Sequence, residues 1–441
     1  MRRIKHLGNY DAAYNDLKND KNNAVAFLFP YNTDFYTKDM SLSKAVLTIK
    51  DNYATKCAPT SGSSKILENF EPGYSATAVK KLYANGAHFV AKVHLDELAL
   101  GGTGTYSGYG LITNPLDKNR YAGGSSSGSV ATFNENISIA LGSDTGDSVR
   151  LPGSYNGIPG FKPSYGAISR YGLYAYASSL DTVAYFAHNV NDIIAMSQVL
   201  YGKDNKDMTS LDVEINDVVK RKPNSVIALD FSEFCEDYVN DAYQQLLQKL
   251  SATGIKVEKI KPNIDILRCV KPAYEIISYS EASSNLANLT GIGFANRIDA
   301  SSWEEIIRST RSKHFGKMVQ ERLSLGSYFL YAENVEEMLF KAQKARRVIV
   351  EYWKSLQDQG DLVIFPAFAA VAPTFDAPKD YDVMSYILTT ANLAGNPSIT
   401  LPLAKHQNLP FSIALETKIY DDKKLLAYAE WFEELIGEKH E

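Results

Sequence analysis

Glycines, serines and one lysine form the group of residues in this sequence that is best suited to chemistry. Residues 123–129 read Gly-Gly-Ser-Ser-Ser-Gly-Ser, residues 142–150 read Gly-Ser-Asp-Thr-Gly-Asp-Ser-Val-Arg, and Lys92 lies upstream on a predicted strand. Turns of this composition present free backbone N–H groups, which bind anions or developing oxyanions. A serine is a weak nucleophile without a base, and a lysine can act as that base where burial lowers its pKa from about 10.4. A lone lysine on a strand is also common as an edge residue, so residue types alone leave both interpretations of Lys92 open.

Several short matches to known functional motifs do not indicate the corresponding sites, because the surrounding residues or the spacing differ from those of the motif. Residues 124–128 match G-x-S-x-G, but a nucleophile elbow follows an apolar strand, whereas residues 117–123 are mostly polar. The S-x-x-K match at residues 41–44 lacks its K-T-G partner. The glycines at 102–108 miss the dinucleotide-binding spacing by one residue. The seven histidines are scattered singly and form no H-E-x-x-H motif, so the sequence predicts no metal site.

The overall composition is that of an ordinary globular protein. The chain has 441 residues, of which 45% are hydrophobic and 22% charged, and its formal net charge is −5. These values argue against a disordered or fibrous chain and against a basic surface that binds nucleic acid tightly. Of the 28 glycines, 13 lie between residues 101 and 160. Three scattered cysteines imply no disulfide framework, and the absence of a long apolar run predicts a cytoplasmic protein that does not enter a membrane.

Hydrophobic patterns predict strands that alternate with helices. Strands are expected at residues 45–50, 88–93, 137–141, 226–229, 255–260 and 362–365, and helices at 76–83, from about 243 to 250, and from 334 to about 353. The segment 226–260 has the order of a β-α-β unit, which favours parallel pairing. An α/β fold follows. With no linker or repeat, residues 1–441 are expected to form one domain, with a catalytic core at about 40–190, a peripheral part at about 220–360 and a return to the core at about 361–441.

Several sequence blocks resemble the amidase signature family. The strongest are the two glycine- and serine-rich segments and the segment Gly-Ile-Pro-Gly-Phe-Lys-Pro-Ser-Tyr-Gly at 157–166. The resemblance extends from Ile-Lys-Asp-Asn at 49–52, through Lys-Val-His-Leu-Asp-Glu at 92–97, to Asn-Leu-Ala-Gly at 392–395, and so covers nearly the whole chain. It implies the amidase-signature fold, in which a large mixed central β-sheet is covered by helices on both faces.

The resemblance also implies a Ser–cis-Ser–Lys triad. Ser148 matches the nucleophile, Ser125 matches the bridging serine that follows a cis peptide bond, and Lys92 is taken as the base. The oxyanion hole would consist of backbone N–H groups of Thr145, Gly146 and Asp147. Gly124 and Arg322 match residues that bind the substrate, and Arg322 would hold the α-carboxylate of the substrate. A helix-surface position is the alternative for Arg322.

Three departures from the family pattern leave questions open. The segment between the two serines is one residue short, so Ser126 competes with Ser125 for the role of relay. Asp147 stands where many members have glycine, and we expect its side chain to turn away from the site, toward Arg150. An aspartate that reads the substrate amino group is missing, because Ser385 or Tyr386 occupies its place.

Within the family, the segments 63–70, 177–181 and 280–286 resemble the A subunits of glutamyl-tRNA(Gln) amidotransferases. The resemblance implies a subunit without its own cofactor that hydrolyses glutamine to supply ammonia. The expected partners are a B and a C subunit of a heterotrimer, with ATP and Mg bound by the partner and Glu-tRNA(Gln) contacted mainly through it. The alternatives are a stand-alone amidase acting on another amide and a degenerate subunit that only binds partners.

Overall fold

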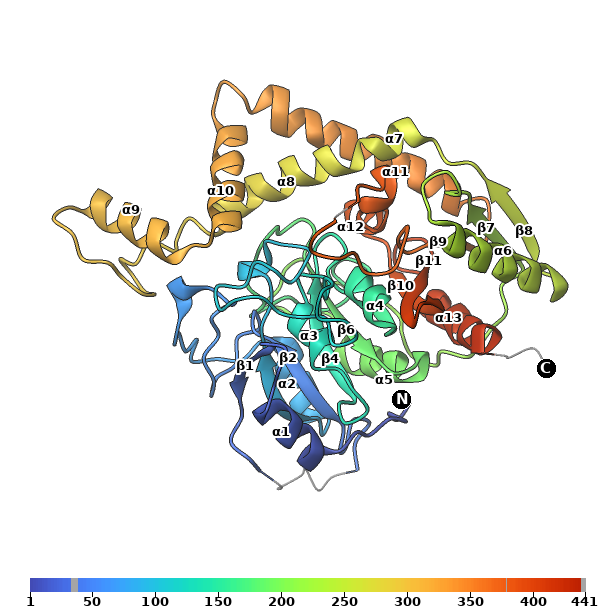
Figure 1. Ribbon diagram of the computed structural model, residues 1–441, viewed down its shortest axis with the longest axis horizontal. Coiled ribbons are helices and arrows are strands. Elements are labelled where there is room, and N and C mark those ends of the chain that lie inside the picture. Colours follow the sequence, from blue (N-terminus) through green and yellow to red (C-terminus); the bar gives the residue numbers. More distant parts are fainter. Residues whose placement is uncertain (33–38, 378, 438–441) are drawn as a thin grey trace.

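The chain folds around one β-sheet that runs through the whole molecule (Figure 1). The structure is a computed structural model, and it describes residues 1–32, 39–377 and 379–437. Within these residues the sheet has 11 strands. They are β1 (Val25–Leu28), β2 (Val46–Lys50), β3 (His88–Val93), β4 (Ile139–Asp144), β5 (Gly160–Lys162), β6 (Thr182–Ala187), β7 (Ser225–Leu229), β8 (Lys256–Ile260), β9 (Leu362–Pro366), β10 (Ser398–His406) and β11 (Leu409–Glu416).

The order of the strands in the sheet is β1-β3-β2-β4-β6-β5-β10-β11-β9-β7-β8. The pairs β3/β2, β2/β4, β9/β7 and β7/β8 are parallel, and the other neighbours are antiparallel. The expectation of a large mixed sheet is therefore confirmed. Strands from the early, middle and late parts of the sequence lie side by side, because β10 and β11 stand between β5 and β9.

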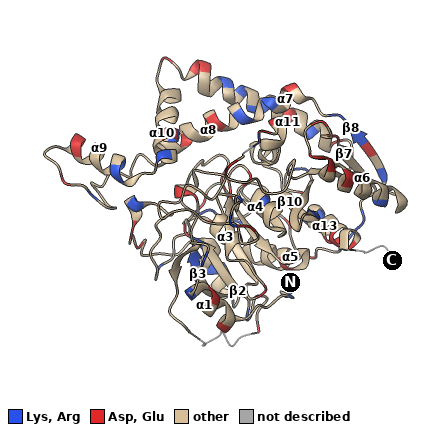
Figure 2. Cartoon of the chain, viewed as in Figure 1, with Lys and Arg blue, Asp and Glu red and all other residues tan. Residues whose placement is uncertain are grey.

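Helices follow most of the strands. Those in the described part of the chain are α1 (Tyr10–Lys18), α2 (Thr77–Ala84), α3 (Ser127–Ala131), α4 (Arg150–Asn156), α5 (Val190–Leu200), α6 (Asp237–Ala252), α7 (Ile264–Arg268), α8 (Val270–Asn285), α9 (Trp303–His314), α10 (Lys317–Leu330), α11 (Lys341–Gln357), α12 (Thr390–Ala394) and α13 (Asp422–Gly437). Figure 1 shows α8, α10 and α11 together on one side of the molecule, with α9 extending outward from them. The charged residues of α11 are mostly basic, with Glu351 as its one acidic residue (Figure 2).

Both faces of the sheet are buried beneath helices. Successive side chains of a strand point to opposite faces, and in β9 Leu362 and Ile364 belong to one hydrophobic cluster while Val363 and Phe365 belong to another. The first cluster also contains residues of α2, α5, α6 and α13, and the second contains residues of α7, α8, α10, α11 and α12. This arrangement confirms the predicted helices on both faces.

The local predictions are confirmed where the hydrophobic pattern is strong. β7, α6 and β8 form the expected β-α-β unit, and β7 and β8 are parallel. The helix predicted from residue 334 begins instead with a π-helical turn at Glu336–Phe340 and continues as α11 to Gln357. The sequence pattern did not indicate α1 or β1, because α1 buries few of its side chains and β1 has only four residues, all half-buried.

Candidate active site

A buried lysine at the end of β2 is the centre of the candidate site. Lys50 is the last residue of the strand and its side chain is fully buried. Its Nζ donates to Ser125 Oγ at 2.8 Å, to Ser126 Oγ at 3.0 Å and to Ser143 Oγ at 2.9 Å. Asn52 Nδ2 also donates to Ser143 Oγ, at 3.0 Å. One amine therefore contacts both glycine- and serine-rich segments of the sequence.

The environment of Lys50 favours the neutral amine. Burial lowers the pKa of Lys50 from its ordinary value of 10.5 to about 7, although the charges of Asp96, Asp144 and Asp181 oppose the decrease. A general base is most effective when its pKa lies near the working pH. At neutral pH a substantial fraction of Lys50 can accept a proton from a neighbouring hydroxyl.

The prediction that Lys92 contacts Ser125 is wrong. In the parallel pair β2/β3, Lys92 lies opposite Ile49, whereas Lys50 lies opposite Val93. Because side chains alternate along a strand, the two lysines leave the sheet on opposite faces. Lys92 Nζ is buried in an ion pair with Asp51 Oδ1 at 2.8 Å and donates to the Pro59 carbonyl at 2.7 Å. Its environment is that of a structural ion pair.

Lys50 belongs to one of the sequence blocks that indicate the family, Ile-Lys-Asp-Asn at 49–52. Lys50 ends a strand that is buried at every residue, but Lys92 lies in a buried stretch near the end of β3, so burial alone does not distinguish the two lysines. β2 is also parallel to β4, so the carboxyl ends of both strands meet at one edge of the sheet. β4 ends at Asp144, and Ser148 follows four residues later.

The first glycine- and serine-rich segment forms a tight turn against this edge. The Gly124–Ser125 peptide bond is cis, and Gly123 has φ +82°. A Cβ on Gly124 would overlap the carboxylate of Asp96 and lie 2.8 Å from the Thr103 nitrogen. Glycine is therefore required at 124 by close packing. Ser125 and Ser126 are both buried, and α3 begins directly after them.

The two candidate relay serines differ in their hydrogen bonds. Ser126 Oγ donates to the Ser143 carbonyl at 3.2 Å, so its proton is engaged. In the described part of the chain, Ser125 Oγ accepts from Lys50 and donates to no acceptor, so its proton is available. The Ser126 N–H also donates to the Ser148 carbonyl at 3.3 Å, which holds the two segments side by side.

The second segment, residues 144–150, is held by a buried ion pair. Arg150 Nη2 lies 2.9 Å from Asp144 Oδ1, and both side chains are fully buried. Arg150 Nη2 also donates to the Gly146 carbonyl at 2.8 Å and to Asn392 Oδ1 at 2.6 Å. Thr145 Oγ1 donates to Asp181 Oδ1 at 2.7 Å. The turn is thus fixed by residues that lie far away in the sequence.

Backbone N–H groups are free in this turn. Among residues 1–32, 39–377 and 379–437, no acceptor bonds the N–H of Thr145, Gly146, Asp147 or Ser148. Four consecutive free N–H groups next to a serine form an arrangement that can bind a developing oxyanion. Ser148 itself is 5% exposed.

A cavity of about 470 Å³ opens beside the turn. Gly146, Asp147 and Arg322 line it. Arg322 Nη1 donates to Tyr176 Oη at 3.2 Å, and its guanidinium lies 5.1 Å from the centre of the Tyr279 ring. The structure therefore brings Arg322 to the same cavity as the turn and does not leave it on an open helix surface.

Asp147 does not turn toward Arg150, contrary to the prediction, because Arg150 is occupied by Asp144. Its side chain lines the cavity instead. Ser385 and Tyr386 line the same cavity. Tyr386 Oη donates to Glu275 Oε1 at 3.3 Å and Ser385 Oγ donates to Asp380 Oδ1 at 3.2 Å, so the two positions where the aspartate was expected carry hydroxyl groups that are bonded to other carboxylates.

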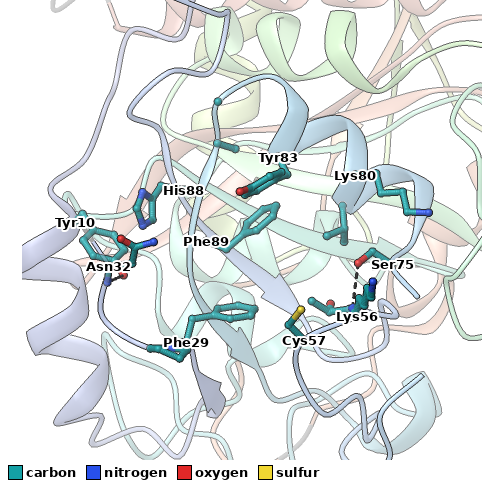
Figure 3. A pocket seen from close by; sticks show the side chains of 15 residues that line it. Tyr10, Phe29, Asn32, Lys56, Cys57, Ser75, Lys80, Tyr83, His88 and Phe89 are labelled. Carbon is teal, nitrogen blue, oxygen red and sulfur yellow. Dashed lines mark hydrogen bonds between the residues drawn. The ribbon is translucent and has the colours of Figure 1, made fainter. Parts of the chain in front are cut away.

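A larger cavity, of about 770 Å³, lies elsewhere, between α2 and the start of β3 (Figure 3). Phe29, Tyr83 and Phe89 point into it, and none of the residues of the Lys50 site lines it. No group of three or more His, Cys, Asp and Glu side chains in the described residues is placed to hold a metal ion. Nor is any described helix both long and apolar enough to span a bilayer.

The chain is similar to known proteins along most of its length. The family model described as Amidase matches residues 1–426. The A subunit of the glutamyl-tRNA(Gln) amidotransferase from Mycoplasma genitalium is 33% identical, over 96% of this chain and 94% of the relative. The corresponding protein of the same name from Campylobacter curvus is 37% identical, over 88% of each chain.

Solved structures agree with this relationship. The crystal structure of the A subunit of the Thermotoga maritima glutamyl-tRNA(Gln) amidotransferase superposes with a TM-score of 0.79 at 30% identity, over 95% of this chain and 90% of that chain. A crystal structure described as an amidase superposes with the same TM-score at 24% identity, which supports the fold. The extent of the family match and of the sequence identity places this chain in the amidase family.

Proposed function

We propose that this chain is the glutaminase subunit of a tRNA-dependent amidotransferase, with Ser148 as nucleophile, Ser125 as relay and Lys50 as base. The observation that carries the proposal is the buried Lys50 amine, 2.8 Å from the Ser125 hydroxyl that follows the cis peptide bond. A serine hydroxyl with a free proton, beside an amine whose pKa is about 7, is suited to relay protons.

The first half of the reaction forms an ester. The Ser148 hydroxyl attacks the side-chain amide carbon of glutamine, and its proton passes through Ser125 to the neutral Lys50 amine. Lys50 then returns a proton through Ser125 to the leaving nitrogen. The C–N bond breaks, ammonia departs, and a glutamyl ester remains on Ser148.

The second half hydrolyses the ester by the same route. Water attacks the ester carbon and gives its proton to Lys50 through Ser125. The C–O bond to Ser148 breaks, the proton returns to the Ser148 oxygen, and glutamate leaves. In both halves the free N–H groups of Thr145, Gly146 and Asp147 stabilise the negative charge on the carbonyl oxygen, at about 3–4 kcal/mol for a donor of this kind.

The substrate and partners are proposed from the relatives, which are named as A subunits of glutamyl-tRNA(Gln) amidotransferases. We infer that this chain hydrolyses glutamine as one catalytic domain in the cytoplasm and passes ammonia to a B subunit, with a C subunit completing a heterotrimer. The B subunit would bind ATP, Mg and most of the Glu-tRNA(Gln), in keeping with the net charge of −5 on this chain.

Two measurements test this proposal. Co-expression with a B-type subunit, followed by glutamine-dependent amidation of Glu-tRNA(Gln), tests the assembly. Ammonia release from glutamine, with mass-spectrometric detection of an acyl adduct on Ser148, tests the chemistry. Ser148→Ala is expected to abolish ammonia release and the adduct, and full activity in that variant would refute the assignment.

A stand-alone amidase is the second candidate, because Ser385 and Tyr386 line the cavity where an aspartate was expected. A panel of amides separates the two functions, since a stand-alone amidase needs no partner and need not prefer glutamine. The third interpretation, a subunit that has lost catalysis, predicts no acyl adduct on Ser148 with any amide of the panel.

A further inference from the structure

Asp147 is a carboxylate in the active-site cavity that no other group neutralises. It lies between Gly146 and Ser148 and lines the cavity of about 470 Å³. Arg150, the nearest arginine in the sequence, is paired with Asp144. In the described residues no hydrogen bond reaches the Asp147 carboxylate, and no cation lies within ion-pair distance of it. Burial of a carboxylate without a partner is costly, and a ligand or water that donates hydrogen bonds to it stabilises the charged form.

Arg322 is the matching cation in the same cavity. Its guanidinium contacts Tyr176 and Tyr279, and among the described side chains no carboxylate lies within 4.0 Å of it. The positive charge of Arg322 nevertheless acts on Asp147. Lys271 and Lys379 also line the cavity, but Lys379 is paired with Glu236 and Lys271 lies over the Tyr386 ring, 5.2 Å from its centre. Asp147 and Arg322 line the same space without pairing with each other. A ligand that carries both a carboxylate and an ammonium group would satisfy both.

The other carboxylates of the cavity already have partners. Glu275 accepts a hydrogen bond from Tyr386 Oη at 3.3 Å, and Asp380 accepts one from Ser385 Oγ at 3.2 Å. Asp380 also accepts from a backbone N–H at 3.0 Å. Asp147 is the cavity carboxylate for which no such partner exists among the described residues.

The position of Asp147 suits an amino acid amide that is attacked at Ser148. Four bonds separate the amide carbon of glutamine from its α-nitrogen, a span of about 5 Å, and the Cα atoms of adjacent residues lie about 3.8 Å apart. A substrate with its amide carbon at Ser148 can therefore place its ammonium group beside the neighbouring Asp147 side chain.

We propose that Asp147 determines specificity by accepting hydrogen bonds from the α-ammonium group of the substrate, while Arg322 holds the α-carboxylate. This inference rests on the proposed glutaminase function. It assigns to the position next to the nucleophile the charged acceptor that the neutral side chains of Ser385 and Tyr386 lack. Burial and the charge of Asp144 raise the pKa of Asp147 to about 7, against the effects of Arg150 and Arg322, and a bound ammonium group would stabilise the charged form.

The test compares glutamine with des-amino glutamine, the five-carbon amide that keeps the carboxylate and lacks the amino group. Asp147→Asn is expected to lower kcat/KM for glutamine about 10- to 100-fold, the effect of losing one charge-assisted hydrogen bond. Most of the change should appear in KM, and kcat/KM for des-amino glutamine should change less than about threefold. Glu275→Gln is the matched comparison, and it should leave the ratio between the two amides as it is in the wild-type protein.

A binding measurement separates recognition from catalysis. In the Ser148→Ala background, calorimetry should show that Asp147→Asn weakens glutamine binding about 10- to 100-fold and leaves binding of des-amino glutamine unchanged. The inference would be overturned if Asp147→Asn weakened binding of the two amides equally. It would also be overturned if Glu275→Gln, and not Asp147→Asn, removed the preference for glutamine over des-amino glutamine. Failure of the wild-type protein to hydrolyse any amide would instead refute the proposed function, and the binding result would still decide the role of Asp147.

Discussion

Replacing Lys50 with Met should remove most of the catalytic activity without destabilising the fold. The pKa of Lys50 falls from 10.5 to about 7 on folding. At about 1.4 kcal/mol per pH unit, this decrease corresponds to a cost of about 5 kcal/mol at pH 7. The hydrogen bonds from Nζ to Ser125, Ser126 and Ser143 offset it by about 1 kcal/mol each. Removing the amine removes both contributions, so the free energy of unfolding should stay equal or rise by about 2 kcal/mol.

The pH dependence of this difference has a defined sign. Between pH 7 and 10.5 the unfolded chain binds a proton at Lys50 that the folded chain does not, so the stability of the wild-type protein rises with pH over this range. The Lys50→Met variant lacks this contribution. Its stability relative to the wild-type protein should therefore be greatest at or below pH 7 and decrease toward pH 10.

Lys92→Met is the matched control, because Lys92 is also buried on a neighbouring strand. This substitution leaves the buried Asp51 carboxylate without its ion pair and should cost about 3–5 kcal/mol of stability. The double variant Asp51→Asn with Lys92→Met should recover most of that loss, since Asn still accepts from the Ser61 N–H.

The assays are urea unfolding at several pH values and ammonia release from glutamine. Lys50→Met should lose activity about 100- to 10,000-fold, the usual contribution of a general base, whereas the double variant at 51 and 92 should keep activity within about tenfold of the wild-type protein. The reasoning is refuted if Lys50→Met retains activity, or if the folded double variant is as inactive as Lys50→Met.

Three further predictions concern the same site. The kcat of the wild-type protein should rise with pH through about 7, because Lys50 must be neutral to accept a proton. A stopped assay at saturating glutamine measures kcat at each pH, and a kcat that falls over this range would contradict the prediction. Ser125→Ala should reduce kcat at least 100-fold and Ser126→Ala less than about tenfold, because the Ser126 hydroxyl proton is already bonded to the Ser143 carbonyl; the reverse order would make Ser126 the relay. Gly124→Ala should destabilise the fold by about 3 kcal/mol or more, since its Cβ would overlap Asp96. Gly102→Ala, whose Cβ meets no atom within 4 Å, should shift the unfolding midpoint only slightly, and equal shifts in the two variants would show that crowding is not the cause.

The sequence predicts the parts of the site that are contiguous in the chain. The glycine cluster and the two serine segments are recognisable because each is a local turn, and its residue types reflect close packing and free N–H groups. Gly124 shows this directly, since no side chain fits beside Asp96.

The local sequence pattern could not show which lysine, Lys50 or Lys92, contacts the serines. Lys50 and Lys92 both lie near the carboxyl ends of buried strands, and only the pairing of Ile49 with Lys92 shows that they point to opposite faces. A shift of one residue in register reverses the faces, and no local pattern of residues fixes that register. The placement of Arg322 and Asp147 in one cavity likewise depends on how α10 packs, more than 150 residues after the turn.

Hydrogen bonds from Arg150, and from Asn392 far along the sequence, orient the peptide units of the turn. In a trans peptide unit the carbonyl and the following N–H point in opposite directions. Arg150 Nη2 donates to the Gly146 carbonyl at 2.8 Å, so the N–H of Asp147, which belongs to the same peptide unit, faces away from Arg150. Asn392 Nδ2 donates to the Asp144 carbonyl at 3.1 Å and thereby directs the N–H of Thr145 outward in the same manner.

The N–H groups of Thr145 and Asp147 in the proposed oxyanion hole are therefore oriented by donors that bind the carbonyl groups of the same peptide units. Arg150 and Asn392 are bonded to each other at 2.6 Å and both bind Asp144, so the two donors act as one unit. Loss of either would leave a buried carbonyl or carboxylate unsatisfied and would free the peptide units to rotate. The return of the chain to the core at α12 is then as necessary for the proposed chemistry as the serines are, because it supplies the donor that fixes the direction of the first N–H.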